Sequence, residues 1–475
     1  MKTTGSISSI GLQKAAAWMK ATFSGEDKSF AGVAIDSRTV AENELFFALI
    51  GEKSNGHHFI EEVERRGAAG IVVSQTVNST LPKLCVEDVG NALGKLAQEY
   101  RKQFNIPMAA ITGSYGKTTV KEMVASILAV EGAVLANQGN FNTEIGLPLT
   151  LLRLTNEHQY AVVEMGARKK GDIHYLMGLA EPSVALINNA GIAHIEIFGS
   201  ELAVRNAKGE LYAGLRPDGI AVINAEDPHV DYWKSLLRGQ TVFTFGYGSN
   251  VNLSISKVDL DLQGSHFILH YQGQMLPIQL NTPGEHNVLN GVAAAATALA
   301  MGASFASVQK GLDQFQPVKG RLQFKKGLRD IQLIDDTYNA NPVSMRAALS
   351  VLATQPGEKW FVMGDMIELG DHAETWHRDI GKEAKRLGIH KMFGIGKMTK
   401  NALLEFGAQG HHYNDKDNLI SEVKHELQAS PKNLTILVKG ARAMRMEEVV
   451  IALQNSEDIP KSDNISKDVK ENRAC

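Results

Sequence analysis

The sequence predicts an α/β protein made of three domains. Short apolar runs typical of buried strands alternate along the chain with longer segments of helical periodicity, which favours mainly parallel sheets covered by helices. The chain has 475 residues, whereas one hydrophobic core stops growing at roughly 250–300 residues. The 44 glycines supply the tight turns that strand–helix alternation needs.

The first predicted domain, residues 1–105, is a small α/β unit. Its strands are expected in "AGVAID", "ELFFALI" and "AAGIVVS", and its helices in segments such as "FIEEVERRG" and "NALGKLAQEYRKQF". The second domain, residues 106–318, begins with the strand "MAAIT" and continues with the buried-strand candidates "YAVVEM", "SVALINN", "GIAVIN" and "TVFTFG". Three later segments, "SISKVDLDL", "SHFILHY" and "MLPIQL", alternate polar and apolar residues and predict antiparallel strands added to a parallel sheet.

The third predicted domain, residues 319–455, follows the linker "QFQPVKGR". The strands "IQLIDD", "KWFVMGD", "KMFGIG" and "TILVKG" are separated by helices that begin near Pro342 and Ala373, and this order predicts a Rossmann-like sheet. The last residues, 456–475, are polar and lack periodicity, so a disordered tail is expected there.

Composition excludes several classes of protein. A net charge of −3 gives no general attraction to nucleic acid or to an anionic membrane. Cys85 and Cys475 are too few for a disulfide framework and fit a reducing cytoplasm. The N-terminus lacks the apolar run of a signal peptide, and the uncharged segment 288–308 is mostly Ala, Gly and Ser, which predicts a buried helix rather than a membrane span. We therefore expect a cytoplasmic protein without nucleic-acid or membrane partners.

The stretch "ITGSYGKTT" (residues 111–119) predicts a phosphate-binding loop. A strand leads into Gly113 and a helix leaves from Lys117, so the first amides of the helix face one point. The usual pattern G-x-x-x-x-G-K-[ST] needs a glycine where Ile111 stands, so this loop is shorter. Lys117 would face the β- and γ-phosphates, and the Thr118 hydroxyl would ligate Mg²⁺. The alternative is a glycine turn before a helix, with Lys117 solvated.

Three polar residues further along are candidates on weaker grounds. Glu164 ends a buried strand, where open α/β sheets bind their ligands, and its carboxylate suits Mg²⁺, although it could equally be a surface charge. His194 follows the next strand, but a loop histidine taken alone is more often structural. Lys208 lies on a predicted helix, where most lysines are solvated.

In the third domain, Asp335 and Asp336 end the strand "IQLIDD" and precede a helix. Two adjacent carboxylates at the carboxyl end of a strand suit ribose hydroxyls, a metal ion or a substrate amine. They could also serve only as a turn and a helix cap.

Together these segments resemble the Mur ligase family, the ATP-dependent ligases that build the peptide stem of peptidoglycan. The shortened loop is that family's form of the phosphate loop, and other matching motifs run through nearly the whole chain in the expected order. They are "GNFNTEIGLP", "EMGA", "AHIEIFGS", "AKGE", "GEHNVLNGVAAAA", "GR" at 320–321, "DDTYNANP", "GDMIELG" with His377, and "VKGARAMRME". Within the family, "DDTYNANPVSM" and "GDMIELG" are most similar to the member that adds D-alanyl-D-alanine to UDP-MurNAc-tripeptide.

The resemblance implies a role for each matching residue. ATP would contact Gly113, Ser114, Tyr115, Gly116, Lys117, Thr118 and Thr119 of the loop, Asn287 and Asn290 at the adenine, Arg321 at the phosphates and Asp336 at the ribose. Mg²⁺ would be held by Thr118, Glu164, His194 and Lys208, with Lys208 carbamylated by CO₂, and catalysis would depend on Lys117, Glu164, His194 and Lys208. The two other substrates would contact Ser37, Arg38, Asn55, Gly56, His57, Asn140, Asn142, Thr143, Asn339 and Asn341.

The resemblance also implies a reaction, and we expect a monomer. ATP would convert the carboxylate of the tripeptide to an acyl phosphate, which the amine of the dipeptide would attack once the third domain closes on the second. Thr143 stands where this enzyme type usually has a second asparagine. The alternatives are the related ligase that adds a single third amino acid to UDP-MurNAc-dipeptide and, more remotely, a folylpolyglutamate synthetase. A P-loop switch protein would leave Lys208 and the third domain unexplained.

Overall fold

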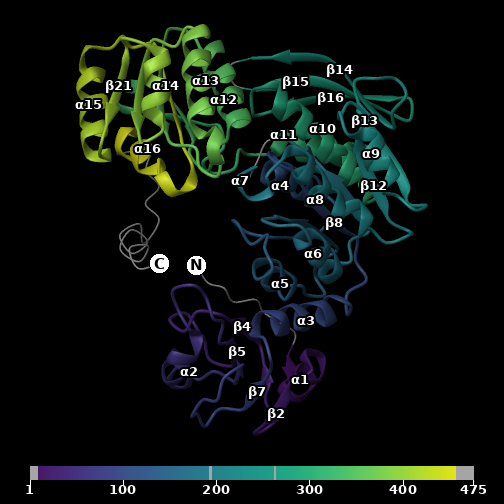
Figure 1. Cartoon of the computed structure of the whole chain (residues 1–475). Coiled ribbons are helices and arrows are strands. Elements are labelled where there is room, and N and C mark those ends of the chain that lie inside the picture. Colours follow the sequence, from purple (N-terminus) through teal and green to yellow (C-terminus); the bar gives the residue numbers. More distant parts are fainter. Residues whose placement is uncertain (1–8, 192–194, 262–263, 456–475) are drawn as a thin grey trace.

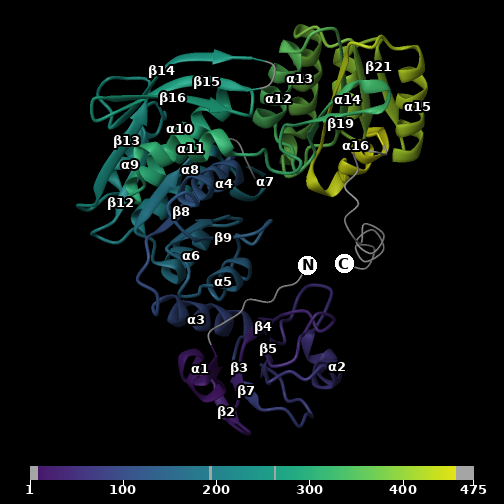
Figure 2. The ribbon, with the colours of Figure 1, turned by 180° about the vertical axis from the view of Figure 1, so that it is seen from behind.

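The computed structural model describes residues 9–191, 195–261 and 264–455. The chain forms three α/β units that follow one another along the sequence, each around its own main sheet (Figure 1). The first and third units lie at opposite ends of the central one, as the view from behind also shows (Figure 2). The predicted α/β class is confirmed, whereas the predicted tail lies outside the described residues.

The first unit is built on a five-stranded sheet. Its strands are β1 (Ile10–Gly11), β2 (Thr22–Ser24), β3 (Ser29–Phe30), β4 (Gly32–Ala34), β5 (Glu44–Phe47), β6 (Gly70–Val73) and β7 (Lys83–Cys85). Its helices are α1 (Leu12–Met19), the short 3₁₀ helix η1 (Gly56–Phe59), α2 (Ile60–Arg65) and α3 (Val89–Arg101). The sheet has the order β2-β7-β6-β5-β4, parallel except for β2, and β1 pairs with β3 beside it.

The helix α3 joins the first unit to the central one. Its Leu93 belongs to the same buried apolar cluster as Leu147 and Leu176 of the central unit. At the end of α3 the buried Arg101 donates from Nε to the carbonyl oxygen of Ala180, at 3.2 Å. These two units therefore share one apolar core.

The central unit is built on a nine-stranded sheet. Its strands are β8 (Met108–Thr112), β9 (Val134–Ala136), β10 (Tyr160–Glu164), β11 (Val184–Ile187), β12 (Ile220–Asn224), β13 (Thr241–Gly246), β14 (Leu253–Leu260), β15 (Ser265–Tyr271) and β16 (Gln274–Leu280). Its helices are α4 (Lys117–Leu128), α5 (Gly146–Leu151), α6 (Asp172–Ala180), α7 (Ile195–Phe198), α8 (Glu201–Ala213), α9 (Val230–Ser235), α10 (Glu285–Ala300) and α11 (Phe305–Gln314).

The strand order of this sheet, β16-β15-β14-β13-β12-β11-β8-β10-β9, decides where a ligand can bind. The strands from β9 to β13 are parallel to their neighbours, and β15 and β16 continue the sheet in antiparallel fashion, as predicted. The strand β14 was also predicted as an antiparallel addition, but it pairs in parallel with β13 and is antiparallel only to β15. The chain moves to one side of β8 to form β10 and to the other side to form β11. Open α/β sheets bind ligands at such a switch point, beside the carboxyl ends of the strands.

The alanine-rich segment is two helices rather than the single buried helix predicted for residues 288–308. The helix α10 ends at Ala300, and α11 begins at Phe305 after a turn in which Gly302 has a φ of +93°. The Ser304 hydroxyl caps α11 by accepting from the amide of Ser307. Throughout the described ranges, no helix is both long and apolar enough to cross a membrane.

The third unit is built on a six-stranded sheet with the order β17-β18-β22-β19-β20-β21. Its strands are β17 (Gln323–Lys326), β18 (Gln332–Asp336), β19 (Glu358–Gly364), β20 (Lys391–Ile395), β21 (Gly410–Tyr413) and β22 (Leu434–Lys439). Its helices are η2 (Leu328–Asp330), α12 (Pro342–Thr354), η3 (Gly370–His372), α13 (Ala373–Arg386), α14 (Thr399–Phe406), α15 (Lys416–Ala429), η4 (Arg442–Met444) and α16 (Glu447–Leu453). Neighbouring strands are parallel except for the edge strand β17, which the sequence analysis did not predict.

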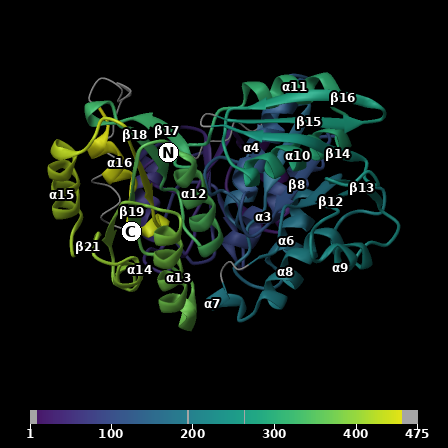
Figure 3. The ribbon, with the colours of Figure 1, turned by 90° about the horizontal axis from the view of Figure 1, so that it is seen from above.

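The third unit meets the central one on the side that carries α12 and α13 (Figure 3). There α7 of the central unit contacts η3. The linker between α11 and β17 crosses the same boundary, and its Arg321 reaches Thr118 at the start of α4. Residues of the third unit are therefore brought to the carboxyl end of the central sheet.

Candidate active site

The predicted phosphate loop connects β8 to α4 in the interior of the nine-stranded sheet. Gly116 has a φ of +77°, a conformation that side chains disfavour. A Cβ atom there would lie 2.6 Å from Asn188 Nδ2 and 2.7 Å from Asn290 Oδ1. Only glycine fits, because the loop is packed tightly against two asparagines from other elements.

Two asparagines that follow β11 shape the loop. Asn189 Oδ1 accepts from the amides of Ser114 and Tyr115, both at 3.0 Å, and the side-chain amides of Asn188 and Asn189 donate to the carbonyl oxygen of Tyr115. The Ser114 and Tyr115 amides are thus engaged within the protein. The amides of residues 116–118, where α4 begins, have no partner in the described part of the chain, and they are the groups available to a phosphate.

Lys117 folds back over the loop. Its Nζ donates to the carbonyl oxygen of Gly113 at 2.7 Å. Burial lowers the pKa of Lys117, Glu164 opposes this change, and Arg321 adds to it. An anion such as a phosphate group would stabilise the charged form of Lys117 in these surroundings.

A chain of hydrogen bonds links the start of α4 to the end of β10. Arg321 donates to Thr118 Oγ1 at 3.0 Å, and this hydroxyl donates to Glu164 Oε2 at 2.8 Å. Asn142 donates to Glu164 Oε1 at 2.7 Å, and Asn137 holds the backbone of Glu164 on both sides. Glu164 is only 3% exposed, so it is not a surface charge. A hydroxyl and a carboxylate side by side are hard oxygen ligands, and this pair fits Mg²⁺.

Lys208 lies on α8 and is buried, contrary to the expectation that a helix lysine is solvated. No residue in the described ranges gives its Nζ a hydrogen bond or an ion pair. Burial and, next, the charge of Lys117 lower the pKa of Lys208 to about 7, while Glu164 opposes the change. In a large fraction of the protein molecules, Lys208 is therefore a neutral amine near pH 7. His194, expected beside it, lies outside the described residues.

Asn287 and Asn290, the expected adenine contacts, are both buried on α10. Asn290 Oδ1 accepts from Asn188 at 3.1 Å, and Asn290 Nδ2 donates to Asn287 Oδ1 at 3.3 Å. Asn287 in turn donates to the carbonyl oxygen of Pro283. The structure therefore brings the start of α10 beside the phosphate loop.

Asp336 and Lys439 form a buried ion pair at the carboxyl end of the third sheet. Lys439 Nζ lies 2.6 Å from Asp336 Oδ2 and also donates to the carbonyl oxygen of Asn339 at 2.9 Å. Asp336 Oδ1 accepts from the amide of Leu322 in the linker. Burial lowers the pKa of His286, on α10, to about 4, with Asp336 opposing and Lys439 adding to this change. The ion pair therefore lies close to the start of α10 in the central unit.

Asp335 and Asp336 do not form a joint carboxylate site. Successive residues of a strand point to opposite faces of the sheet. On the face opposite Asp336, Asp335 Oδ2 lies 2.6 Å from Lys325 Nζ. Asn339 is exposed, whereas Asn341 caps α12 by accepting from the amide of Ser344. Asn341 therefore uses its side-chain oxygen to stabilise a helix.

The first-unit candidates lie on two loops. Ser37 donates to Glu62, and Arg38 pairs with Asp36. The other three candidates form η1 and its cap, Asn55, Gly56 and His57. His57 is held between Asn55 Oδ1 and the amide of Ser74, and a Cβ on Gly56 would lie 2.8 Å from the backbone of Ala48.

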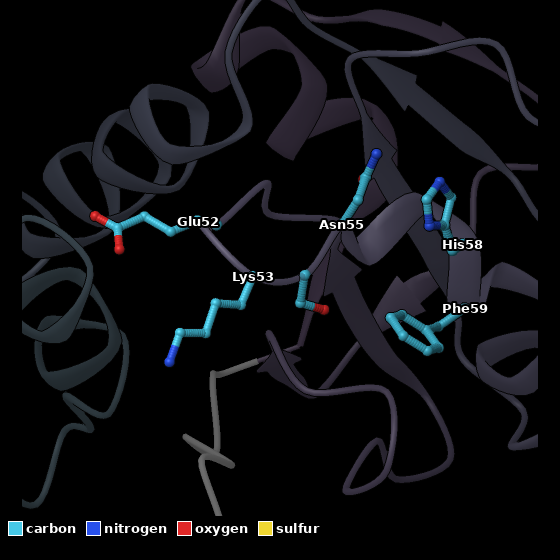
Figure 4. Close-up of a pocket in the computed structure, with 7 residues that line it drawn as sticks. Glu52, Lys53, Asn55, His58 and Phe59 are labelled. Atoms are coloured by element: carbon cyan, nitrogen blue, oxygen red, sulfur yellow. The ribbon is translucent and has the colours of Figure 1, made fainter. Parts of the chain in front are cut away.

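Beside η1 lies an open hollow of about 370 Å³, lined by Gly51, Glu52, Lys53, Ser54, Asn55, His58 and Phe59. Glu52 and Lys53 stand on one side of it, and His58 and Phe59 on the other (Figure 4). Of the three candidates at 140–143, Asn140 is exposed, Asn142 contacts Glu164, and Thr143 accepts a long hydrogen bond from the amide of Gly146.

Comparison with known proteins agrees with this arrangement. The family model described as "Mur ligase family, catalytic domain" matches residues 29–105, "Mur ligase middle domain" matches 111–298, and "Mur ligase, glutamate ligase domain" matches 320–442. A UDP-N-acetylmuramoyl-tripeptide–D-alanyl-D-alanine ligase from Escherichia coli (strain K12) is 40% identical over 434 residues, which are 91% of this chain and 95% of that protein. The chain belongs to the Mur ligase family.

Solved structures of Mur ligases have the same fold. MurF from Acinetobacter baumannii is 33% identical, with a TM-score of 0.89 over 94% of this chain and 99% of that one. MurF ligase from Thermotoga maritima, solved in complex with ADP, is 27% identical, with a TM-score of 0.78 over 88% of this chain and 96% of that one. This Mur ligase is thus similar along nearly all of its length to proteins of one named type.

Several residues of the site in this Mur ligase were not singled out from the sequence. They are Asn137, Asn188, Asn189, His286 and Lys439. Asn188, Asn189 and Lys439 stand at or directly after the ends of buried parallel strands, the signal that identified Glu164, so the same rule could have found them. Asn137 directly follows the parallel strand β9, but that short, half-buried strand was not predicted. His286 gives no comparable signal, because its surroundings come from a distant segment of the chain.

Proposed function

We propose that this Mur ligase joins D-alanyl-D-alanine to the terminal carboxylate of UDP-MurNAc-tripeptide, with ATP as co-substrate, and forms UDP-MurNAc-pentapeptide, ADP and phosphate. The observation that carries the proposal is the 40% identity to the E. coli enzyme of that name over 91% of this chain. The match to the family model in the third unit supports it, since that unit is expected to receive the amine. ATP is a cytoplasmic reagent, which supports the expected cytoplasmic location.

The reaction needs ATP because a carboxylate does not react with an amine at neutral pH. A carboxylate oxygen of the tripeptide attacks the γ-phosphorus of ATP, ADP leaves, and an acyl phosphate forms. The amine of the dipeptide then attacks the acyl carbon and gives up one proton to solvent, and phosphate leaves with the oxygen that came from the carboxylate. The protein performs little covalent chemistry in the first step, so positioning and charge neutralisation dominate.

We assign this neutralisation to the phosphate loop and Arg321. In our proposal the free amides of residues 116–118, with Lys117 and Arg321, bind the phosphates of ATP. Asn287 and Asn290 line the adenine, and Asp336 accepts from the ribose. Because these groups come from two units, the complete site exists only when the units are together, which also keeps water from the acyl phosphate.

Mg²⁺ fits beside the loop, where Thr118 and Glu164 would hold it with His194. When bound, the ion supplies positive charge to the β- and γ-phosphate oxygens. Asn142 and Asn137 orient Glu164 for this role through the hydrogen bonds that they make with it.

We also propose that Lys208 is carbamylated. Its neutral amine attacks CO₂, a nitrogen–carbon bond forms, and one proton is released to solvent, so that a buried amine becomes an anionic ligand. The lowered pKa of Lys208 favours this reaction, because only the unprotonated amine is nucleophilic. The negative carbamate would lie close to Lys117 and would balance its charge.

The three units then have separate tasks in the proposed enzyme, which works as a monomer. Residues 1–105 bind the UDP end of the sugar nucleotide, with Ser37, Arg38 and the hollow beside η1. The segment 140–143 borders the sugar or peptide part. Residues 106–318 bind ATP, and residues 319–455 bind the dipeptide near Asn339 and Asn341.

An amine-competition assay tests the proposal. Purified protein receives ATP, Mg²⁺ and UDP-MurNAc-tripeptide, and phosphate release is followed with D-alanyl-D-alanine or with single amino acids such as lysine. We expect release and a pentapeptide mass only with the dipeptide. A preference for UDP-MurNAc-dipeptide with a single amino acid would instead identify the related ligase and overturn the proposed function.

A further inference from the structure

Arg321 spans the boundary between the third and central units, and its guanidinium group makes few hydrogen bonds. Its NH2 group donates to Thr118 Oγ1 at 3.0 Å, but its Nε is buried and has no hydrogen-bond partner in the described ranges. A long side chain attached at one end by a single hydrogen bond has several rotamers available. Something other than hydrogen bonding must therefore orient its guanidinium group.

Tyr338 provides that support. Arg321 Cζ lies 4.3 Å from the centre of the Tyr338 ring, well inside the range of about 6 Å over which a cation is attracted to an aromatic face. The Tyr338 hydroxyl has no hydrogen bond with any described residue. The contact therefore depends on the ring and not on the phenol oxygen.

The backbone holds Tyr338 beside the linker that carries Arg321. The amide of Tyr338 donates to the carbonyl oxygen of Gly320 at 3.0 Å, and the amide of Leu322 donates to Asp336 Oδ1 at 3.2 Å. Gly320 has a φ of +72°, and a Cβ there would lie 3.1 Å from the Tyr338 amide nitrogen. The linker and the loop after β18 are thus bonded on both sides of Arg321.

We infer that Tyr338 is a positioning residue whose ring aims Arg321 at the nucleotide phosphates. The inference rests on the proposed function, since it takes ATP as the ligand. Tyr338 directly precedes Asn339, which the proposal places near the dipeptide. One loop therefore orients both the phosphate-binding arginine and the region that receives the amine.

Binding of the non-hydrolysable ATP analogue AMPPNP with Mg²⁺, measured by calorimetry, tests the inference without requiring turnover. We expect Tyr338→Leu to weaken binding about 10-fold and to raise the KM for ATP by the same factor, as expected for a partly desolvated cation–π contact. Tyr338→Phe keeps the ring and should bind as the native protein does. The KM for UDP-MurNAc-tripeptide should not change in either variant.

A double-mutant cycle separates positioning from a general structural effect. In an Arg321→Ala background, Tyr338→Leu should cause no further loss of AMPPNP affinity, because its partner is gone. Tyr413→Leu removes another half-buried tyrosine, on the edge strand β21 of the third unit's sheet. This control variant should bind AMPPNP as the native protein does. Native affinity in Tyr338→Leu, or losses that add in the double variant, would overturn the inference.

A change of ring electrostatics gives a second test that does not depend on how well Tyr338→Leu folds. Pentafluorophenylalanine at position 338 keeps the shape of phenylalanine but removes the negative face of the ring, so AMPPNP binding should weaken relative to Tyr338→Phe. Equal binding by the two would contradict the inference. If these variants differ in AMPPNP binding as expected but the native protein forms no pentapeptide, the proposed function fails and the assignment of Tyr338 to Arg321 stands.

Discussion

Lys208 in the central unit and Lys439 in the third unit are both only 2% exposed, but their surroundings differ. Lys439 Nζ lies 2.6 Å from a carboxylate oxygen of Asp336 and donates to the carbonyl oxygen of Asn339. Lys208 has neither kind of partner among the residues that the structure describes. Its pKa falls to about 7, because burial and the nearby Lys117 disfavour its charged form.

The difference separates two uses of a buried lysine. Burial lowers the pKa of Lys439 as well, but there Asp336 opposes the change through its charge and its hydrogen bond. In this pair Lys439 holds Asp336 in place. An unpaired lysine loses its proton and becomes a nucleophile, which suits Lys208 for carbamylation. A buried ionisable group that the fold does not pair is a functional candidate on physical grounds.

The largest expected effect is on the activity of Lys208→Ala. If the carbamate belongs to the metal shell, ligation should fall by about 100-fold or more, since loss of a residue that supports a metal site costs 10–100-fold and here a ligand itself is lost. Added formate or acetate should restore part of the rate by replacing the missing carboxylate. Native activity without added carboxylate would show that Lys208 is not needed.

Exchange of each lysine for methionine should affect the free energy of unfolding to different extents. Lys439→Met leaves Asp336 buried and unpaired, and we expect a loss of about 3–5 kcal/mol in the free energy of unfolding. Lys208→Met removes an unpaired buried amine and should not destabilise the protein. Denaturant titrations of both variants measure this contrast.

The double variant Lys439→Met with Asp336→Asn controls the stability experiment. Its asparagine carries no charge, so it should recover a large part of the loss in Lys439→Met. A loss in Lys208→Met as large as that in Lys439→Met would contradict the distinction between the two lysines.

The titration of Lys208 should be visible in the pH dependence of the free energy of unfolding. In the unfolded chain this amine keeps its proton up to about pH 10.5, whereas in the folded protein its pKa is about 7. The unfolded state therefore binds more protons between these values, and the contribution of Lys208 to stability increases with pH across that window. In buffer free of CO₂, the native protein should show this rise and Lys208→Met should lack it. Identical pH profiles would show that Lys208 titrates normally.

The smallest effect is expected for Thr143→Asn. The Thr143 hydroxyl accepts a long, 3.4 Å hydrogen bond from the amide of Gly146, whereas its neighbour Asn142 is the residue that donates to Glu164. We expect the KM for UDP-MurNAc-tripeptide to change by less than about threefold and AMPPNP binding to stay constant, as for most surface substitutions. A large change in affinity for the sugar nucleotide would place Thr143 in direct contact with it.

The fold class and the phosphate loop could be predicted because both depend on local patterns. The strand before Gly113 and the helix from Lys117 follow from periodicity and from glycine spacing alone. The position of Glu164 follows from one general rule about strand ends. Edge strands such as β17 and β21 were missed because they are short and half-exposed, and so carry little apolar signal.

The burial and pairing of charged residues could not be predicted in the same way. Lys208 reads as a solvated helix lysine, and only the packing of α8 against the sheet removes it from water. Asp335 and Asp336 look equivalent in sequence, yet strand geometry gives them different partners, Lys325 and Lys439. Such differences arise from contacts between segments distant in the chain.

The central claim is that ATP activates a carboxylate at this site, and transfer of an oxygen isotope tests it most directly. UDP-MurNAc-tripeptide labelled with ¹⁸O in its terminal carboxylate would be incubated with the protein, ATP, Mg²⁺ and D-alanyl-D-alanine. The acyl phosphate predicts that each phosphate released carries one oxygen from that carboxylate, detectable as a mass shift. Release of unlabelled phosphate together with pentapeptide would contradict the account, because the amide would then form without an acyl phosphate.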